Sequence, residues 1–229
     1  MMKVEIWSDV MCPFCYIGKR KFENALAQFA QKENVEVEWK SFQLNPELVN
    51  NNGQSIHEYL AERKGWTLSY ARQLNEQVTG MAAEVGLEYN FDKAVVANSF
   101  DAHRFAHLAA KYGLGDAAEE SLFKAYFTEG KDISDRGVLA QLGAGIGLDP
   151  EEVSSTLSGN TYAREVQQDI AEAAALGARG VPFFVIDRKY AVSGAQPEEI
   201  FLKALQQSFN EQATTDSNGN ACSIDGDCA

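Results

Sequence analysis

The chain has 229 residues, of which 45% are hydrophobic, and a formal net charge of −13, so it can bury one sizeable core with room for a satellite bundle. The negative charge argues against nucleic acid and anionic membrane as partners, because both require clustered lysine and arginine. No run approaches the roughly 20 apolar residues that span a bilayer, and the charged N-terminus lacks a secretory signal, so we expect a cytoplasmic protein.

The first predicted elements are a strand, a helix and a second strand. Residues 3–8 alternate apolar and polar side chains, as a strand does. An amphipathic helix is predicted from residue 12 to about residue 32, and residues 35–41 again alternate. A right-handed crossover would make the two strands parallel.

A helical block follows, because residues 56–176 show helical periodicity and turn signals but no convincing β run. Helices are predicted near 67–85, 98–112, 116–128, 135–146, 149–158 and 162–176. His103 and His107 lie four residues apart and could share a metal, but their apolar neighbours favour packing, so no metal is predicted. Phe123, Tyr126 and Phe127 are expected in the core.

The β signal returns at residues 180–187 and 190–194, which predict a hairpin. Gln196-Pro197 then opens a last helix that we expect to end near residue 209. The polar, small residues after it predict a flexible linker to a closing pair of cysteines, Cys222 and Cys228.

Cys12 and Cys15 stand three positions apart between the first strand and the first helix. A thiol reacts as its thiolate, and the free N–H groups at a helix start favour that anion. Pro13 suits the first helical turn, and Cys15 falls one turn on, within disulfide distance of Cys12. In a chain with only four cysteines and no secretory signal, this pattern indicates a redox-active dithiol.

Three other interpretations of this pair are weaker. Half of a zinc site needs two more ligands nearby, and none is present in the surrounding sequence. A purely structural disulfide across so short a loop removes little unfolded-state entropy, and Pro13 has no reason to separate two inert buried thiols. We interpret Asp9 as a turn residue at the helix start rather than a proton carrier, and expect Lys19 and Arg20 to be solvated.

The order of motifs resembles the DsbA family of thioredoxin-fold oxidoreductases, and more closely its FrnE-like branch. The matching segments are residues 12–19, 41–46, 98–104, 180–185 and 191–197. The resemblance implies an α/β thioredoxin fold with a large all-helical insertion. It places the thioredoxin-like domain at residues 1–46 and 178–209, the insertion at 47–177 and a flexible tail at 210–229. It also implies thiol–disulfide exchange with protein substrates, without a cofactor.

The resemblance assigns roles to the site residues. Cys12 is the expected nucleophile, and Cys15 resolves the mixed disulfide. X-Pro bonds are mostly trans, but the family places a cis proline opposite the dithiol, here Pro182, so that the backbone of Val181 faces a bound peptide. Pro13 and Phe14 are expected to contact the substrate. Phe14 stands where strongly oxidising members have His, so strong oxidising power is not assumed.

Cys222 and Cys228 are expected to act as a second redox pair, with an incidental disulfide as the alternative. The expected partners are protein or peptide thiols and disulfides, with glutathione or a thioredoxin-type protein as the recycling partner.

Other functions stay open at this point. Kappa-class glutathione transferases and hydroxychromene-carboxylate isomerases share the architecture but use Ser in place of the first cysteine, so Cys12 argues against their chemistry. A peptide-binding holdase and a zinc protein are the non-enzymatic alternatives.

Overall fold

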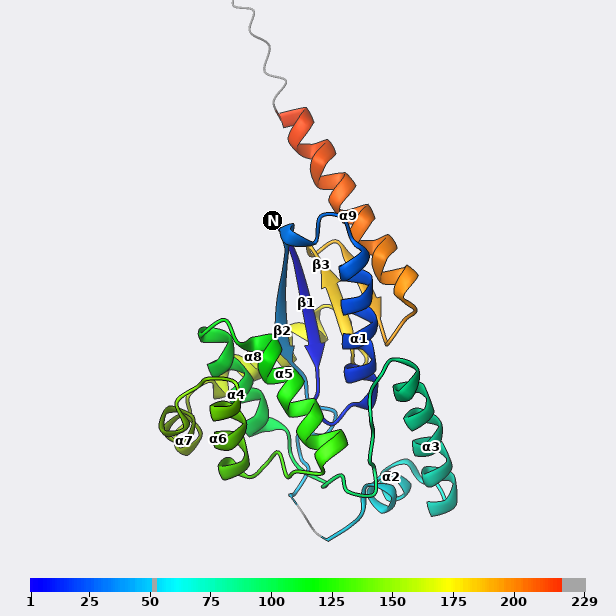
Figure 1. The fold of residues 1–229 in the computed structure, drawn as a ribbon, viewed down its shortest axis with the longest axis vertical. Helices are drawn as coiled ribbons and strands as arrows, with labels where there is room; N and C mark the ends of the chain where they lie inside the picture. The colour runs from blue at the N-terminus through cyan, green and yellow to red at the C-terminus, as the bar shows by residue number, and fades with distance from the viewer. Residues whose placement is uncertain (51–52, 220–229) are drawn as a thin grey trace, which may run out of the picture.

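A computed structural model describes residues 1–50 and 53–219, and at its centre lies a four-stranded mixed sheet in the order β2-β1-β3-β4 (Figure 1). Strands β1 (Met2–Ser8) and β2 (Val35–Ser41) pair in parallel, as the crossover argument predicts. Strand β3 (Phe183–Ile186) runs antiparallel to β1, and β4 (Tyr190–Ser193) completes the predicted hairpin. The α/β thioredoxin-like architecture is therefore confirmed.

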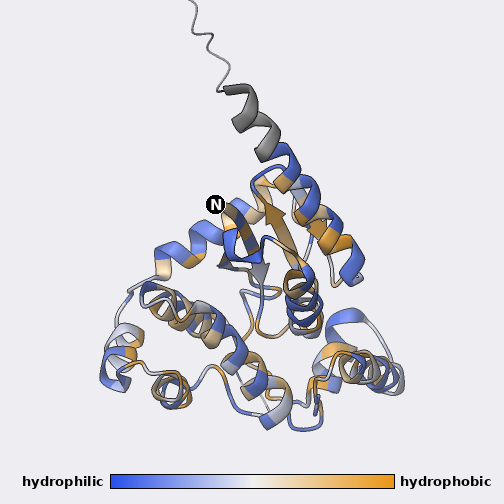
Figure 2. Ribbon diagram, turned by 45° about the horizontal axis from the view of Figure 1, so that its top comes forward, coloured by the Kyte–Doolittle hydropathy of each residue, from blue (hydrophilic) through white to orange (hydrophobic). Residues whose placement is uncertain are grey.

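Both faces of the sheet are buried. On one face Val4 and Ile6 pack with Phe22 and Phe184. On the other face Trp7 packs against residues of α8 (Ala163–Ala175) and β3, and its Nε1 donates to the backbone oxygen of Asp169 at 2.8 Å. Figure 2 shows hydrophobic colour along one strand at the centre of the sheet and mixed colours on the surrounding helices. Packing on both faces fixes the sheet, and with it the loop after β1 and the segment before β3.

Helices α1 (Pro13–Gln28) and α9 (Glu198–Gly219) cover the first face (Figure 1). Helix α1 ends earlier than predicted, and a 3₁₀ turn, η1 (Lys32–Asn34), leads into β2. The prediction that the last helix ends near residue 209 is wrong, because α9 continues to Gly219. No Pro or Gly interrupts it before that residue, and Ser208 and Gln212 both donate to the Asp187 carboxylate in the β3–β4 turn.

Helices fill the chain between β2 and β3. They are α2 (Ile56–Lys64), α3 (Leu68–Glu84), α4 (Phe100–Lys111), α5 (Gly115–Lys124), the π-helical turn η2 (Ala125–Glu129), α6 (Arg136–Gly145), α7 (Pro150–Ser158) and α8. All six predicted helices are present near their expected bounds. Helix α2 was not predicted separately, although Ser55 and Glu58 form a capping box that marks its start.

Hydrogen bonds join two of the segments named in the sequence analysis, residues 41–46 and 98–104. Gln43 donates to Asn98 at 2.9 Å, and the Asn98 amide donates in turn to the backbone oxygens of Pro46 and Leu48. This network fixes the chain that leaves β2 against the start of α4. Among residues 1–50 and 53–219, no helix has the length and apolar character to cross a membrane.

Candidate active site

The two cysteines lie where β1 ends and α1 begins. Cys12 is the N-cap residue, with extended φ and ψ of −89° and 111°, and Pro13 occupies the first helical turn. The Cys12 backbone N–H donates to the Asp9 oxygen at 2.9 Å, and the Cys15 N–H donates to the Cys12 oxygen at 3.0 Å. The first turn therefore holds both thiols at one end of the sheet, between α3 and α5 (Figure 1).

The segment before β3 forms the opposite wall of the site. The Val181–Pro182 peptide bond is cis, as the resemblance implied. The Cys12 thiol donates to the Val181 carbonyl oxygen at 3.4 Å, so residues 169 positions apart in sequence meet at the reacting sulfur. A Cβ on Gly18 would lie 2.9 Å from the Pro182 ring, and this close approach explains a glycine inside α1.

The two thiols are both shielded, and the second more so. Cys12 is 4% exposed and Cys15 is 1% exposed, and neither is in a disulfide. Burial raises the pKa of the Cys15 thiol well above its ordinary value, and the neighbouring Cys12 adds to this effect, while the Asp9 backbone N–H opposes it. Phe14, between them, is 38% exposed and presents an apolar ring beside the dithiol.

Aromatic side chains join the dithiol helix to the helical block. Tyr89 donates from its hydroxyl to the Pro13 oxygen at 2.6 Å. Tyr16 stacks on Phe123 at 4.9 Å, and Tyr89 stacks on Phe127 at 4.5 Å. The predicted core position of Phe123 and Phe127 is confirmed, and the contacts show that this core also supports the first turn of α1.

The expectation that Lys19 and Arg20 are solvated is wrong for the lysine. Lys19 is 1% exposed, and its ammonium contacts Glu23, Asp116 at 3.1 Å and Glu120 at 3.4 Å. Burial works against its charge, but these carboxylates raise its pKa above the ordinary value. No sequence pattern indicated these ion pairs, because Asp116 and Glu120 belong to α5, about 100 positions after Lys19.

His103 and His107 of α4 each approach a different carboxylate, so the two histidines do not converge on one site. Asp9 accepts from the Met11 and Leu44 backbone N–H groups, the turn role predicted for it, and its Oδ1 also lies 3.7 Å from His103 Nε2. His107 Nε2 instead lies 3.0 Å from Asp169 Oδ2. No group of three or more potential metal ligands occurs within the described part of the chain.

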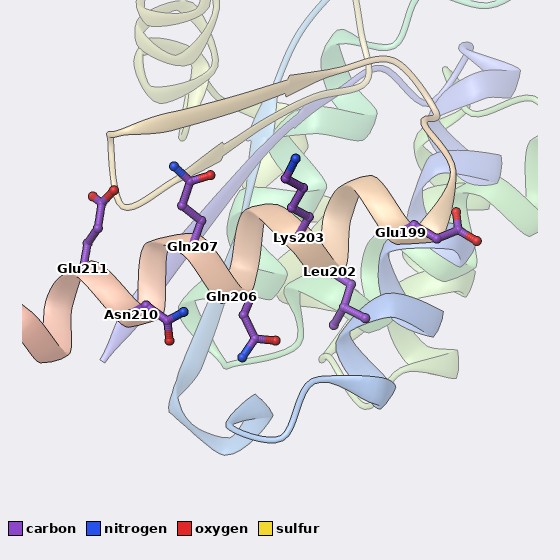
Figure 3. A pocket seen from close by; sticks show the side chains of 7 residues that line it. All are labelled: Glu199, Leu202, Lys203, Gln206, Gln207, Asn210 and Glu211. Carbon is purple, nitrogen blue, oxygen red and sulfur yellow. The ribbon is translucent and has the colours of Figure 1, made fainter.

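Cys222 and Cys228 fall outside the described residues, so their proposed role stays a prediction. A wide hollow of about 560 Å³ lies along α9 and is lined from that helix alone (Figure 3). It contains no cysteine or histidine, and its Gln207 and Glu211 bond to Tyr190 of the hairpin, so it offers none of the expected chemistry.

Comparisons with known proteins agree with this geometry. Residues 3–206 match the family model described as DSBA-like thioredoxin domain. The Bacillus subtilis (strain 168) protein YwbO, described as uncharacterized, is 31% identical over 209 residues, covering 88% of this chain and 94% of that protein.

Two solved structures extend the comparison. A probable DsbA oxidoreductase from Streptomyces coelicolor is 38% identical with a TM-score of 0.87, covering 100% of this chain and 95% of its own. The cytosolic disulfide reductase DsbM from Pseudomonas aeruginosa, solved with GSH, is 18% identical with a TM-score of 0.65. That match covers 91% of this chain and 99% of DsbM, and at this identity it shows the fold alone.

Proposed function

Because the chain belongs to the DSBA-like thioredoxin domain family and is a DsbA-like oxidoreductase, we propose that it exchanges disulfides with protein substrates through Cys12 and Cys15. The observation that carries this proposal is the meeting of the Cys12 sulfur with the Val181 carbonyl, 3.4 Å apart, directly before Pro182. The interlocked motifs at residues 43–48 and 98 support placement in the FrnE-like branch.

The proposed reaction gives the attack to Cys12, at the N-cap of α1, and the resolving step to Cys15, one turn further along that helix. The Cys12 thiolate attacks a substrate disulfide, a Cys12–substrate S–S bond forms, and the other substrate sulfur leaves as a thiolate that takes a proton from water. Cys15 then attacks Cys12, the internal disulfide forms, and the second substrate thiol is released. The substrate is reduced by one electron pair and the dithiol is oxidised.

Three residues beside the dithiol are proposed to bind the substrate. The exposed Phe14 ring and the Pro13 ring offer apolar contact to a peptide. The backbone of Val181 is proposed to pair with an extended peptide segment as an added strand. Pro182 shapes this wall of the site and completes the catalytic set.

We propose that the reductive direction prevails, in the cytoplasm, with glutathione or a thioredoxin-type protein as recycling partner. Phe14 has no charge with which to stabilise a thiolate, which disfavours a strong oxidant.

The proposed domain division is residues 1–46 and 178–209 for the thioredoxin-like part and 47–177 for the helical insertion. Its support is that all four strands lie in the first part, while helices α2 to α8 lie in the second or just at its edge. The contacts of Tyr89 with Pro13 and of Phe123 with Tyr16 give the insertion a direct role in holding the dithiol.

The C-terminal cysteine pair is proposed to exchange with the dithiol of a second molecule. Phe209 of α9 contacts Phe29. The helical rise of α1 places Phe29 about 25 Å from Cys12. Beyond Phe209, α9 continues for ten residues, about 15 Å, in the direction away from the dithiol (Figure 1). Nine extended residues after Gly219 span at most about 31 Å. Cys222 and Cys228 therefore fall short of their own Cys12 while α9 stays helical.

A complementation assay tests this exchange between molecules. A chain truncated after Gly219 keeps the dithiol, and a Cys12→Ser/Cys15→Ser chain keeps the tail. If the tail acts between molecules, mixing the two raises turnover above that of the truncated chain, increasingly so at higher protein concentration. No gain on mixing, with full-length turnover per molecule independent of concentration, would contradict the proposal.

Insulin disulfide reduction tests the main activity. We expect turnover with dithiothreitol as electron source and none for Cys12→Ser. The same assay with added glutathione separates recycling from the glutathione-dependent isomerase or transferase alternative, which requires glutathione and leaves insulin intact. Metal analysis of the reduced protein identifies the zinc alternative, and protection of an unfolded protein by the Cys12→Ser chain identifies a holdase.

A further inference from the structure

Strand β2 forms one edge of the sheet. The strand order is β2-β1-β3-β4, so the seven residues of β2 pair with β1 on one side only (Figure 1). A free edge presents backbone groups that can template a further strand, and native proteins usually shorten, charge or cover such an edge. Where the outward-facing backbone groups of β2 find their hydrogen bonds is therefore an accounting question.

Two hydrogen bonds at the C-terminal end of β2 show which way its backbone groups point. The Phe42 N–H donates to the Ser8 oxygen of β1 at 2.9 Å, so it points inward. The Ser41 N–H points the opposite way and donates to Asp169 Oδ2 of α8 at 2.9 Å. Because successive residues of a strand alternate in direction, the odd-numbered residues of β2 face outward and the even-numbered residues face β1.

The unpaired backbone groups of this edge lie in the middle of the strand. At the N-terminal end the Val35 N–H donates to the Lys32 oxygen, and at the C-terminal end the Ser41 N–H is held by α8. Between these ends, the N–H and carbonyl groups of Val37 and Trp39 have no hydrogen-bond partner within the described part of the chain. An added strand would therefore find its donors and acceptors at these two residues.

A groove of about 440 Å³ lies along this edge. Its lining includes β2 from Glu36 to Ser41, and the other lining residues come from α4, α5 and the turn between them. Around that turn they are small, namely Ala110, Gly113 and Gly115. The volume falls within the range of about 300–1,000 Å³ that is usual for ligand sites. No residue of the dithiol site lines the groove, so it is a separate surface.

The ionisable side chains around the groove are mostly acidic, and they are Glu36, Glu38, Lys40, His107, Asp116 and Glu119. The Lys40 ammonium lies 2.7 Å from Glu38, so the one lysine of the groove is already paired. Asp116 is likewise paired, with Lys19 at 3.1 Å. Glu36 is exposed and has no ion pair among residues 1–50 and 53–219. Opposite charges on neighbouring strands attract, so a strand added at this edge is favoured if it places a basic side chain beside Glu36.

We propose that an extended segment of a partner protein, carrying lysine or arginine, docks in this groove and pairs with Val37 and Trp39 as a fifth strand. Its backbone supplies the hydrogen bonds that the edge lacks, and its basic side chains select for the acidic lining. This segment is distinct from the substrate segment proposed at Val181. The docking goes beyond the exchange reaction and does not depend on it.

Fluorescence anisotropy with a fluorescein-labelled peptide of alternating lysine and valine tests this docking on the full-length protein. We expect saturable binding. The same peptide with proline in place of valine keeps the charge but loses backbone N–H donors, so it should bind at least about tenfold more weakly. Equal binding of the two peptides would overturn strand pairing, because it would show attraction by charge alone.

Two variants of β2 separate the backbone from the charge. Val37→Pro removes an outward N–H at an edge position that tolerates proline, so it should weaken binding about tenfold. Glu36→Lys should weaken binding about fivefold. Both variants should keep the far-ultraviolet circular dichroism spectrum and the insulin turnover of the unchanged protein. Unchanged peptide binding in Val37→Pro would overturn the proposal.

Amide hydrogen exchange on the unchanged protein gives a test that needs no variant. In the free protein the Val37 and Trp39 amides should exchange at least about tenfold faster than those of Glu38 and Lys40, and the peptide should slow the first pair only. Equal protection of both pairs without peptide would overturn the free edge. Protection of Val37 and Trp39 that rises with protein concentration alone would assign the edge to a second copy and overturn the partner segment.

Discussion

Replacement of Gly18 by alanine tests the contact between α1 and Pro182. In an open helix, alanine is more stable than glycine by about 1 kcal/mol. At Gly18, however, the new Cβ would lie 2.9 Å from Pro182 Cγ and 3.5 Å from Phe184 Cζ, and overpacking of this kind costs about 1–3 kcal/mol. The expected net effect is a loss of about 1 kcal/mol of stability, with lower disulfide turnover because Pro182 must move.

Gly80→Ala provides the matched control, because Gly80 lies inside α3 and a Cβ added there would have nothing within 4 Å. That variant should gain up to about 1 kcal/mol, so the two variants should differ by about 2 kcal/mol. With a urea m-value of about 2 kcal/mol/M, their unfolding midpoints separate by about 1 M. Equal stabilisation by both substitutions, with full activity, would refute the argument that Pro182 requires a glycine here.

Further predictions concern buried charges. Arg104 donates to carbonyl oxygens near the end of α7, so Arg104→Lys should lower the unfolding free energy by about 3 kcal/mol in urea titrations, and a loss below about 1 kcal/mol would contradict this. Burial raises the pKa of Glu119 to about 7, so the stabilisation from its protonated form is complete below about pH 4.5 and is lost as pH rises through 7. The unfolding free energy of Glu119→Gln should therefore rise by about 3 kcal/mol relative to that of the unchanged protein between these two pH values. A difference that stays constant with pH would refute this. Burial opposes the Asp169 charge, but His107 and the Ser41 N–H lower its pKa, so its contribution is present above about pH 4 and is lost as pH falls through the folded value. Asp169→Asn should therefore flatten the acid limb of the stability profile, and an equally steep limb would count against the pairing.

Local patterns in the sequence predicted most of the fold. Alternation located β1 and β2, the β-type runs at residues 180–187 and 190–194 located the hairpin, and the position of Pro13 located the start of α1. The extension of α9 to Gly219 was missed because its last ten residues have no apolar stripe in the sequence. Ser208 and Gln212 donate to Asp187 in the β3–β4 turn, a long-range contact that no local pattern marks.

The candidate site was predictable only in part, for the same reason. Cys12 and Cys15 are neighbours in sequence, so their pairing could be inferred directly. The contacts of Asp9 with His103, of Lys19 with Asp116 and of Gly18 with Pro182 join segments about 90 to 165 positions apart, and nothing local marks them. The burial of Glu119 in particular could not be predicted, since a single acidic residue in a helix is ordinarily a solvated side chain.

Trapping of the mixed disulfide tests the central claim most directly. The Cys15→Ser protein is reduced, freed of reductant and incubated with insulin, and the adduct is identified by mass spectrometry under non-reducing conditions. We expect a covalent adduct joined through Cys12, present in Cys15→Ser and absent from Cys12→Ser, and released by dithiothreitol. Adducts of equal yield in both variants, or none in either, would contradict the assignment of Cys12 as nucleophile and Cys15 as resolving thiol.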